Sequence, residues 1–169
     1  MILYILSLAC GIGILAIDQL TKYYISSNFE LGYTADFIKG IINIHYIHNR
    51  GAAWGMLSGY TWVLLAITVI VMVGCVVLLL KNSIKSKLML WAMTLVLSGG
   101  IGNLIDRVFR DGNVVDFLHF EFWPEFPVFN VADCSIVVGA GLLILYFVLD
   151  SIREYKQKKP QGSQEESDG

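Results

Sequence analysis

Four long stretches with almost no charged residues dominate this chain. The stretches are residues 1–17, 60–80, 88–105 and 131–149, and only Asp133 interrupts the last of them. A helix needs about 20 apolar residues to cross the hydrocarbon core of a bilayer, and each stretch reaches that length with its flanks. The pattern predicts an all-α polytopic membrane protein with four transmembrane helices, at about 1–25, 60–80, 88–109 and 131–149.

The composition agrees with this fold class. Hydrophobic residues make up 56% of the 169 residues and charged residues only 15%, which is too apolar for an ordinary soluble domain. The formal net charge is -2 and the basic residues form no long stripe, so we expect no nucleic-acid partner. Cys10, Cys75 and Cys134 lack the spacing of a disulfide framework or a zinc site, and we expect no metal.

The distribution of basic residues predicts the orientation of the spans. The second and third spans are joined by a segment with Lys81, Lys85 and Lys87, and residues 150–159 hold four more basic residues. The connections at about 26–59 and 110–130 hold few. Because cytoplasmic segments are enriched in Lys and Arg, both termini are predicted to be cytoplasmic.

The domain organisation follows from the same pattern. We expect one membrane domain over residues 1–155 and a disordered cytoplasmic tail over 156–169, which is polar. The first stretch has no basic residue before it and stays apolar to Ile25, so we interpret it as a retained span rather than a cleaved signal peptide.

Polar side chains gather at the predicted outer ends of three spans. These residues are Asp18, Lys22, Asn103, Asp106, Arg107, Asn130 and Asp133. An ionisable group within a span is costly, so its presence indicates a function. We therefore predict a functional site near the outer membrane face.

Structural explanations exist for parts of this set. Asp18 and Lys22 are spaced i,i+4, which fits either a helix-end ion pair or a site-shaping role. Asn130 suits an N-cap with Asp133 in the first helical turn. Both alternatives stay open on the sequence alone.

The glycines of the third and fourth spans predict close helix packing rather than a phosphate loop. These glycines are Gly99, Gly100, Gly102, Gly139 and Gly141.

The outer connections have features of their own. Residues 41–47 have strand-forming composition and residues 49–51 supply a turn, which predicts a small extracytoplasmic β-sheet beside a short outer helix or loop. Aromatic residues suited to the headgroup level also lie here, either as membrane anchors or as a rim that admits a lipid-bearing substrate. They are Trp54, Tyr60, Trp62, Phe120, Phe122, Trp123, Phe126 and Phe129.

The available nucleophiles narrow the chemistry. No serine stands in a recognisable motif with a histidine or lysine. His45 and His48 are three apart, a spacing that in a strand points them to opposite faces and disfavours a shared metal. A pair of carboxylates from Asp106, Asp116 and Asp133 remains.

Spacing alone does not choose between Asp106 and Asp116, but their neighbours differ. Asp106 follows Asn103 by one helical turn and adjoins Arg107, which favours a structural ion pair. Asp116 has only apolar residues beside it, which favours a raised pKa and a catalytic role.

Five ordered blocks resemble the signature of the lipoprotein signal peptidase (signal peptidase II) family. They are Asp-Gln-x-x-Lys at 18–22, Asn-Arg-Gly-Ala-Ala-Trp-Gly at 49–55, Gly-Gly-x-Gly-Asn-Leu-Ile-Asp-Arg at 99–107, Val-Val-Asp-Phe at 114–117 and Phe-Asn-Val-Ala-Asp at 129–133. Trp54 and Cys134 stand where the family more usually has phenylalanine and serine or threonine. The resemblance covers nearly the whole chain except the tail.

The resemblance implies an aspartyl endopeptidase of the bacterial cell (inner) membrane. Such an enzyme removes signal peptides from diacylglyceryl-modified prolipoproteins, cleaving just before the lipidated cysteine, and works without a cofactor. By position, Asp116 and Asp133 would be the catalytic dyad. The substrate-binding or site-shaping residues would be Asp18, Lys22, Asn49, Gly51, Asn103, Asp106, Arg107, Asn130 and Ala132. We expect a monomer that meets its lipidated prolipoprotein in membrane lipid.

Two other functions fit parts of the pattern. In a small transporter or channel, Asp18, Asp106 and Asp133 would form a proton or cation path. In a non-catalytic assembly factor, the glycine patches would contact partner helices.

Overall fold

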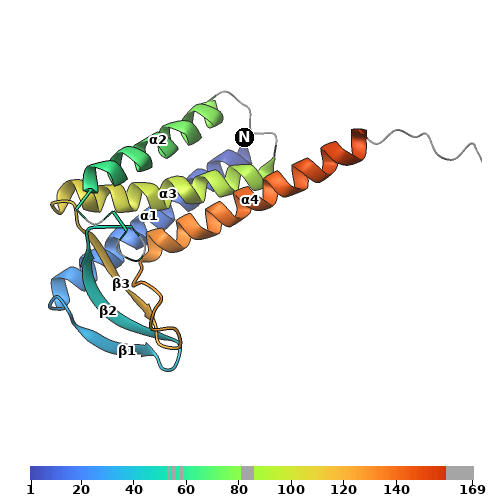
Figure 1. Cartoon of the computed structure of the whole chain (residues 1–169). Helices are drawn as coiled ribbons and strands as arrows, with labels where there is room; N and C mark the ends of the chain where they lie inside the picture. Colours follow the sequence, from blue (N-terminus) through green and yellow to red (C-terminus); the bar gives the residue numbers. More distant parts are fainter. Residues whose placement is uncertain (53, 55, 58, 81–85, 159–169) are drawn as a thin grey trace, which may run out of the picture.

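The computed structural model describes residues 1–52, 54, 56–57, 59–80 and 86–158. Its long helices are α1 (Ile2–Asn28), α2 (Thr61–Leu80), α3 (Lys87–Phe109) and α4 (Val131–Lys158) (Figure 1). Each of these helices is long and apolar enough to cross a membrane. The predicted class, a four-span membrane protein, is therefore confirmed.

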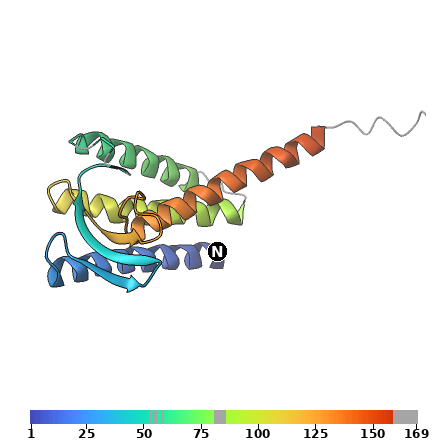
Figure 2. The ribbon, with the colours of Figure 1, turned by 60° about the horizontal axis from the view of Figure 1, so that its bottom comes forward.

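The helices extend past the apolar stretches that predicted them. α1 continues to Asn28 and α4 continues to Lys158, through the polar residues after 149 and into the predicted tail. The C-terminal part of α4 projects beyond the other helices (Figure 2). An apolar stretch indicates only the part of a helix that lipid would surround. The helix itself can continue beyond the lipid, because its backbone hydrogen bonds also form in water. Residues 159–169 of the predicted tail, and Lys81 and Lys85, lie outside the described residues.

α3 is the central helix of the bundle. α1, α2 and α4 all pack against it, and half of its most apolar segment is buried, against no more than 17% in the other helices. Their outer faces carry large exposed apolar side chains such as Ile70, Phe147 and Ile144. So much exposed apolar surface suits a lipid environment.

Glycines allow α3 and α4 to pack closely. A Cβ atom at Gly139 would lie 2.8 Å from the carbonyl oxygen of Ala92, and one at Gly102 would lie 3.2 Å from the Ala132 Cβ. Gly99 likewise faces the Ala132 carbonyl. The packing prediction is thus confirmed for these three. It is wrong for Gly141, where a Cβ would meet nothing within 4 Å, and Gly100 would make only ordinary contacts with Met72.

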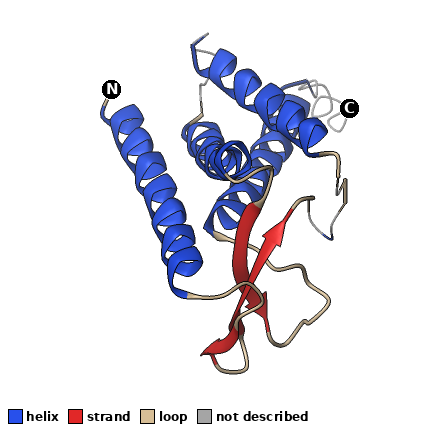
Figure 3. Cartoon of the chain, turned by 90° about the vertical axis from the view of Figure 1, so that its left-hand side faces the viewer, coloured by secondary structure: helices blue, strands red, loops and turns tan. Residues whose placement is uncertain are grey.

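A three-stranded antiparallel sheet lies at one end of the bundle (Figures 1 and 3). Its strands, in spatial order, are β1 (Thr34–Ile38), β2 (Ile42–Asn49) and β3 (Val114–Phe120). β2 confirms the predicted strand, whereas β1 and β3 were not predicted. The N terminus and the C-terminal end of α4 lie at the opposite end of the bundle (Figure 1).

The sheet is fixed to the helices by its own apolar core. Ile25 near the end of α1 packs with Tyr46 of β2 and with Val115 and Phe117 of β3, all of them buried. The β2–β3 register places Asn49 opposite Val114 and Ile47 opposite Asp116. The backbone N–H groups of Phe117 and Leu118 both donate to the carbonyl of Phe129, which holds the start of α4 beside β3.

Candidate active site

A fully buried lysine joins α1 to α3 at the sheet end of the bundle. Lys22 Nζ lies 3.0 Å from Asp18 Oδ2 and 3.1 Å from Asp106 Oδ2, and it donates to Asn103 Oδ1 at 2.9 Å. A buried charge is tolerated only when opposite charges and hydrogen bonds surround it. The predicted ion pair of Asp18 with Lys22 is therefore confirmed, and Lys22 also links α1 to Asn103 and Asp106 of α3.

Asp18 reaches the start of α4. Its Oδ1 accepts from the backbone N–H of Ala132 at 2.9 Å, in the first turn of α4, where the helix dipole favours a negative charge. A Cβ atom at Gly102 would lie 2.5 Å from Asp18 Oδ2, so the glycine leaves room for this carboxylate. Gln19 supports the arrangement from α1, donating to Asp18 Oδ2 at 3.0 Å and to the Gly102 carbonyl at 3.1 Å.

Asp106 is held in an ion-pair network, as predicted, but its partners differ from those expected. Besides Lys22, Asp106 pairs with Arg110 at 3.3 Å, one helical turn further on, and accepts from the backbone N–H of Val115 at 3.1 Å. The adjacent Arg107 points elsewhere, because consecutive residues on a helix do not face each other. Asp106 thereby anchors the beginning of β3 to α3.

Arg107 belongs to the cavity instead. Its Nη2 donates to the carbonyl of Gly51 at 3.1 Å, and its buried Nε has no hydrogen-bond partner in the part of the chain that the structure describes. Sequence reasoning missed Arg110 as the partner of Asp106. The i,i+4 spacing of Asp106 and Arg110, which places both side chains on one face of the helix, is the sequence feature that could have identified this pair.

Asn130 caps α4 and also bridges the aspartates. The Asp133 backbone N–H donates to Asn130 Oδ1 at 2.9 Å, and the Asn130 backbone N–H donates to Asp133 Oδ2 at 3.1 Å, which is a reciprocal capping box. The side-chain amide of Asn130 donates to Asp116 Oδ1 at 2.6 Å and to Asn103 Oδ1 at 3.1 Å. The N-cap prediction is therefore confirmed, and the same side chain also contacts Asp116.

Asp133 receives a further bond through Asn103. The Asn103 amide accepts from Lys22 with its oxygen and donates to Asp133 Oδ1 with its nitrogen, at 2.7 Å. Because an amide has distinct donor and acceptor ends, Lys22 determines that Asn103 presents its N–H₂ group to Asp133.

Asp116 is almost completely buried in β3, with an exposed fraction of 1%. Asn49 donates to its Oδ2 at 2.9 Å, opposite the Asn130 bond to Oδ1. Burial and, next, the negative charge of Asp133 raise the pKa of Asp116 to about 7, although the hydrogen bonds from Asn49 and Asn130 lower it in part. The carboxyl therefore exchanges its proton near neutral pH.

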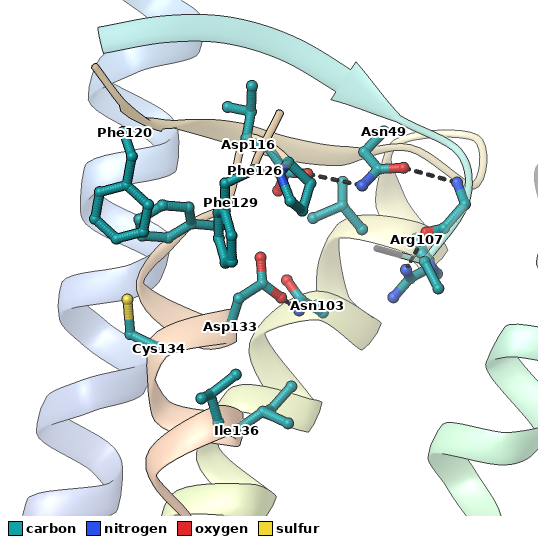
Figure 4. A pocket seen from close by; sticks show the side chains of 16 residues that line it. Asn49, Asn103, Arg107, Asp116, Phe120, Phe126, Phe129, Asp133, Cys134 and Ile136 are labelled. Carbon is teal, nitrogen blue, oxygen red and sulfur yellow. Dashed lines mark hydrogen bonds between the residues drawn. The ribbon is translucent and has the colours of Figure 1, made fainter. Parts of the chain in front are cut away.

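The two aspartates line one cavity of about 420 Å³. Its polar end holds them together with Asn49, Asn103 and Arg107 (Figure 4). The remaining wall is mostly apolar and includes Phe120, Phe126, Phe129, Cys134, Ile136 and Val137. A few polar groups at one end of an apolar pocket are the usual character of a ligand site.

The predicted aromatic rim contributes to this wall. The rings of Phe120, Phe126 and Phe129 pack together with centroids 5.0 to 5.7 Å apart. Trp54 and Trp123 contact Phe126 from outside and are exposed. The outer members therefore suit the membrane surface, and the inner members line the cavity.

Neither histidine of β2 is part of a metal site among the described residues, where no group of three or more His, Cys, Asp or Glu side chains has a metal-binding arrangement. His45 Nδ1 bonds the Thr34 hydroxyl at 2.7 Å, and His48 Nε2 bonds the Tyr46 hydroxyl at 2.9 Å.

Comparison with solved structures places the fold among bacterial membrane enzymes. Two structures of a bacterial membrane enzyme, obtained by the in meso method, match at TM-scores of 0.80 and 0.75, each with 35% sequence identity. The first match covers 86% of this chain and 88% of the solved one, and the second covers 83% and 91%.

Sequence relatives are more specific. The chain is 46% identical to the lipoprotein signal peptidase of Bacillus pumilus over 137 residues, which cover 80% of this chain and 88% of the relative. It is 43% identical to that of Enterococcus faecalis, covering 89% and 90%, and 38% identical to that of Halalkalibacterium halodurans, covering 94% and 99%. The family model described as signal peptidase (SPase) II matches residues 10–149. The chain therefore belongs to the signal peptidase II family of membrane proteases.

Proposed function

We propose that this chain removes signal peptides from prolipoproteins whose cysteine already carries diacylglycerol, cleaving just before that cysteine with Asp116 and Asp133 as a catalytic dyad. The observation that carries the proposal is the pairing of these two carboxylates at the polar end of an apolar cavity, with the pKa of Asp116 raised to about 7. Relatives that share most of the chain are named lipoprotein signal peptidases.

Like charges held close together do not both ionise easily, so one aspartate of such a dyad keeps its proton. We assign the proton to Asp116, which lies in a buried strand. Asp133 lies in the first turn of α4, and its carboxylate accepts from Asn103 and from the backbone N–H of Asn130. These bonds and the helix dipole favour its ionised form.

The reaction then follows aspartic protease chemistry. Asp133 takes a proton from a water molecule as the water oxygen attacks the scissile carbonyl carbon, and Asp116 gives its proton to the carbonyl oxygen. In the tetrahedral intermediate the C–N bond breaks while Asp133 returns its proton to the leaving nitrogen. A hydroxyl proton of the intermediate returns to Asp116 as the new carboxyl group forms, which restores both aspartates.

The other residues of the set support this chemistry. Asn49, Asn103 and Asn130 hold the dyad through the bonds described above. The Arg107 guanidinium lies in the cavity wall beside the Gly51 carbonyl, where its free Nε suits a hydrogen bond to the substrate backbone. Asp18, Lys22 and Asp106 join α1, α3, β3 and α4 around the site, and Ala132 completes the start of α4.

We further propose that the protein lies in the bacterial cytoplasmic membrane, with both termini inside and the dyad near the outer face. The sheet lies at one end of the bundle, and the N terminus and the C-terminal end of α4 lie at the other (Figure 1). The basic residues near the C-terminal end of α4 support a cytoplasmic location for that end. Acyl chains would then remain in lipid while the peptide bond reaches the dyad.

A transporter is less well supported. Asp18 and Asp106 bond Lys22 and backbone N–H groups, and neither side chain lines the cavity that holds Asp133. Together these carboxylates resemble a structural network rather than a path for ions.

A direct assay tests the function. Purified protein is incubated with a lipidated prolipoprotein and with its non-lipidated form, and the products are identified by mass spectrometry. We expect cleavage just before the cysteine of the lipidated form and at least about 100-fold slower cleavage of the other. Equal cleavage of both forms would contradict lipid-dependent recognition, and no cleavage of either would contradict the peptidase assignment.

A further inference from the structure

A second cavity, of about 380 Å³, adjoins the active-site cavity at the sheet end. It shares Asn49, Pro127 and Val128 with the active-site cavity and is otherwise lined by Ile47, His48, Arg50 and Trp54. Asn49 belongs to both and bonds Asp116 Oδ2 at 2.9 Å (Figure 4). A chain that leaves the dyad past Asn49 therefore enters the second cavity directly.

The two cavities differ in chemical character. The wall of the first is mostly apolar, and its charged residues are Arg107 and the two aspartates, whereas the second holds Arg50 and His48 without a carboxylate. Arg50 is held by a hydrogen bond from its Nε to Asn113 Oδ1 at 3.1 Å, and His48 by its 2.9 Å bond to the Tyr46 hydroxyl. None of the lining residues is acidic, and no ion pair neutralises Arg50 among the described residues. The second cavity thus has a positive electrostatic potential that favours anionic groups.

The course of α4 indicates which part of a substrate meets which cavity. From Asp133 the helix runs away from the sheet, so Ile136 and Val137 line the first cavity on the side of the bundle. An apolar signal peptide suits that side. The chain on the other side of the scissile bond has to leave toward the sheet, where the second cavity lies.

We propose that the second cavity is a binding subsite for the residues that follow the lipidated cysteine, and that Arg50 with His48 makes it favour acidic side chains there. The inference rests on the proposed function, since it assumes cleavage at the dyad. An extended chain advances about 3.4 Å per residue, so two to four residues after the bond span about 7 to 14 Å. Asn49 bonds Asp116 and Arg50 is the next residue of the chain, so these few substrate residues are the ones that would pass Asn49 and meet Arg50.

Three lipidated substrates test the subsite. They differ only in the two residues that directly follow the lipidated cysteine. These two residues are both glutamate in the first substrate, both glutamine in the second and both lysine in the third. We expect kcat/KM at low salt to fall from the glutamate to the glutamine to the lysine substrate, by about two- to fivefold at each step, the scale of a solvent-exposed charge pair. The preference should weaken as salt rises.

Charge reversal at Arg50 identifies the residue responsible. Arg50→Glu should reverse the order of the glutamate and lysine substrates, and Arg50→Gln should reduce the preference even if the reversed charge impairs folding. Lys39→Glu is the matched control. It makes the same change from a positive to a negative charge on the exposed β1–β2 turn. From that turn β2 runs seven residue steps, or about 23 Å, from Ile42 to Asn49. The preference of Lys39→Glu should equal that of the unmodified protein.

The outcomes separate this proposal from the proposed function. Equal rates for the three substrates, an unchanged preference in both Arg50 variants, or an equal shift in Lys39→Glu would overturn the subsite while cleavage itself continues. Failure of the unmodified protein to cleave any of the three would overturn the proposed function and the subsite with it.

Discussion

Asp106 and Asp116 are both buried carboxylates at the sheet end of the bundle, and their partners distinguish them. Asp106 pairs with two cations, Lys22 and Arg110, and accepts a backbone N–H. Among the described residues, Asp116 accepts hydrogen bonds from the neutral side-chain amides of Asn49 and Asn130, and it lies in a cavity wall with Asp133. The two cations give Asp106 a structural role, whereas Asp116 lies among neutral groups and has the raised pKa of a group that can exchange its proton near neutral pH.

Asparagine substitutions test this difference. We expect Asp116→Asn and Asp133→Asn each to lower the rate of cleavage by at least about 100-fold while the protein folds, because each removes a proton-transfer group. Asp106→Asn should chiefly lower stability, because it weakens the bonds of buried Lys22 and of Arg110. Turnover per folded molecule, with folding checked by thermal unfolding in detergent, separates the effects. A folded and active Asp116→Asn protein beside a folded and inactive Asp106→Asn protein would transfer the catalytic role to Asp106.

The raised pKa of Asp116 predicts the pH dependence of activity. If its protonated form donates to the carbonyl oxygen, kcat/KM should fall about tenfold per pH unit above pH 7.

The same shift in the pKa of Asp116 means that the folded state binds this proton more tightly than the unfolded state does. The contribution of Asp116 to stability is therefore greatest below the ordinary pKa of 3.8 and is lost as the pH rises to about 7.

Asn49 provides a control for that profile. Its hydrogen bond lowers the pKa of Asp116 by stabilising the ionised form. In Asn49→Ala the decline of kcat/KM should therefore begin at higher pH, whatever the loss in absolute rate. A decline at the same pH in both proteins would mean that another group titrates.

At the scale of elements, the α3–α4 contact positions the dyad. Asn103 comes from α3, Asp133 comes from α4 and Asn130 caps α4, so the hydrogen bonds of Asn103 to Asp133 and Asn130 depend on how closely the two helices approach. Gly99 and Gly139 allow that approach. The cap of α4 and the β3–Phe129 hydrogen bonds then fix the beginning of α4 beside Asp116.

Two glycines of α4 form a matched test of this packing. Gly139→Ala should lower the free energy of unfolding by about 1–3 kcal/mol, because its methyl group would lie 2.8 Å from the Ala92 carbonyl oxygen, on a backbone that cannot easily move. Gly141→Ala meets nothing within 4 Å and should be neutral or stabilising by up to about 1 kcal/mol, since alanine favours the helix. Thermal unfolding in one detergent measures both. Equal effects would show that the close contact at Gly139 does not limit the packing.

At the scale of the whole molecule, the bundle has two different ends. One end carries the sheet, and the other carries the N terminus and the C-terminal end of α4 (Figure 1). The dyad and the aromatic wall line the cavity beside β3. Exposed apolar side chains cover the helices between them. This arrangement suits a protein that crosses the bilayer and works at one surface of it.

Cysteine labelling tests which end faces outward. In a background without Cys10, Cys75 and Cys134, a membrane-impermeant thiol reagent should label Glu30→Cys in intact cells and label Gln157→Cys only after the membrane is opened. Both positions are exposed, at opposite ends of the bundle. Permeabilised cells show that each thiol is reactive. Labelling of Gln157→Cys alone in intact cells would reverse the proposed orientation.

The sequence was sufficient for the properties that depend on local composition. Apolar runs of about 20 residues predicted the four spans, and the isolated polar residues within them predicted which ends come together around a site. The apolar neighbours of Asp116 predicted its raised pKa. Each of these follows from hydropathy or from adjacent residues, which the sequence contains directly.

Only the tertiary structure decided the properties that depend on distance through space. β1 and β3 are short and irregular in pattern, and they exist as strands because β2 lies between them. The partner of Asp106 is Arg110 rather than Arg107, and Gly141 faces open space while Gly139 faces a backbone. The two cavities, with Asn49 between them, combine residues from β2 to α4. Strand register, helix rotation and the shape of a cavity depend on the mutual packing of distant segments, which the order of residues does not contain.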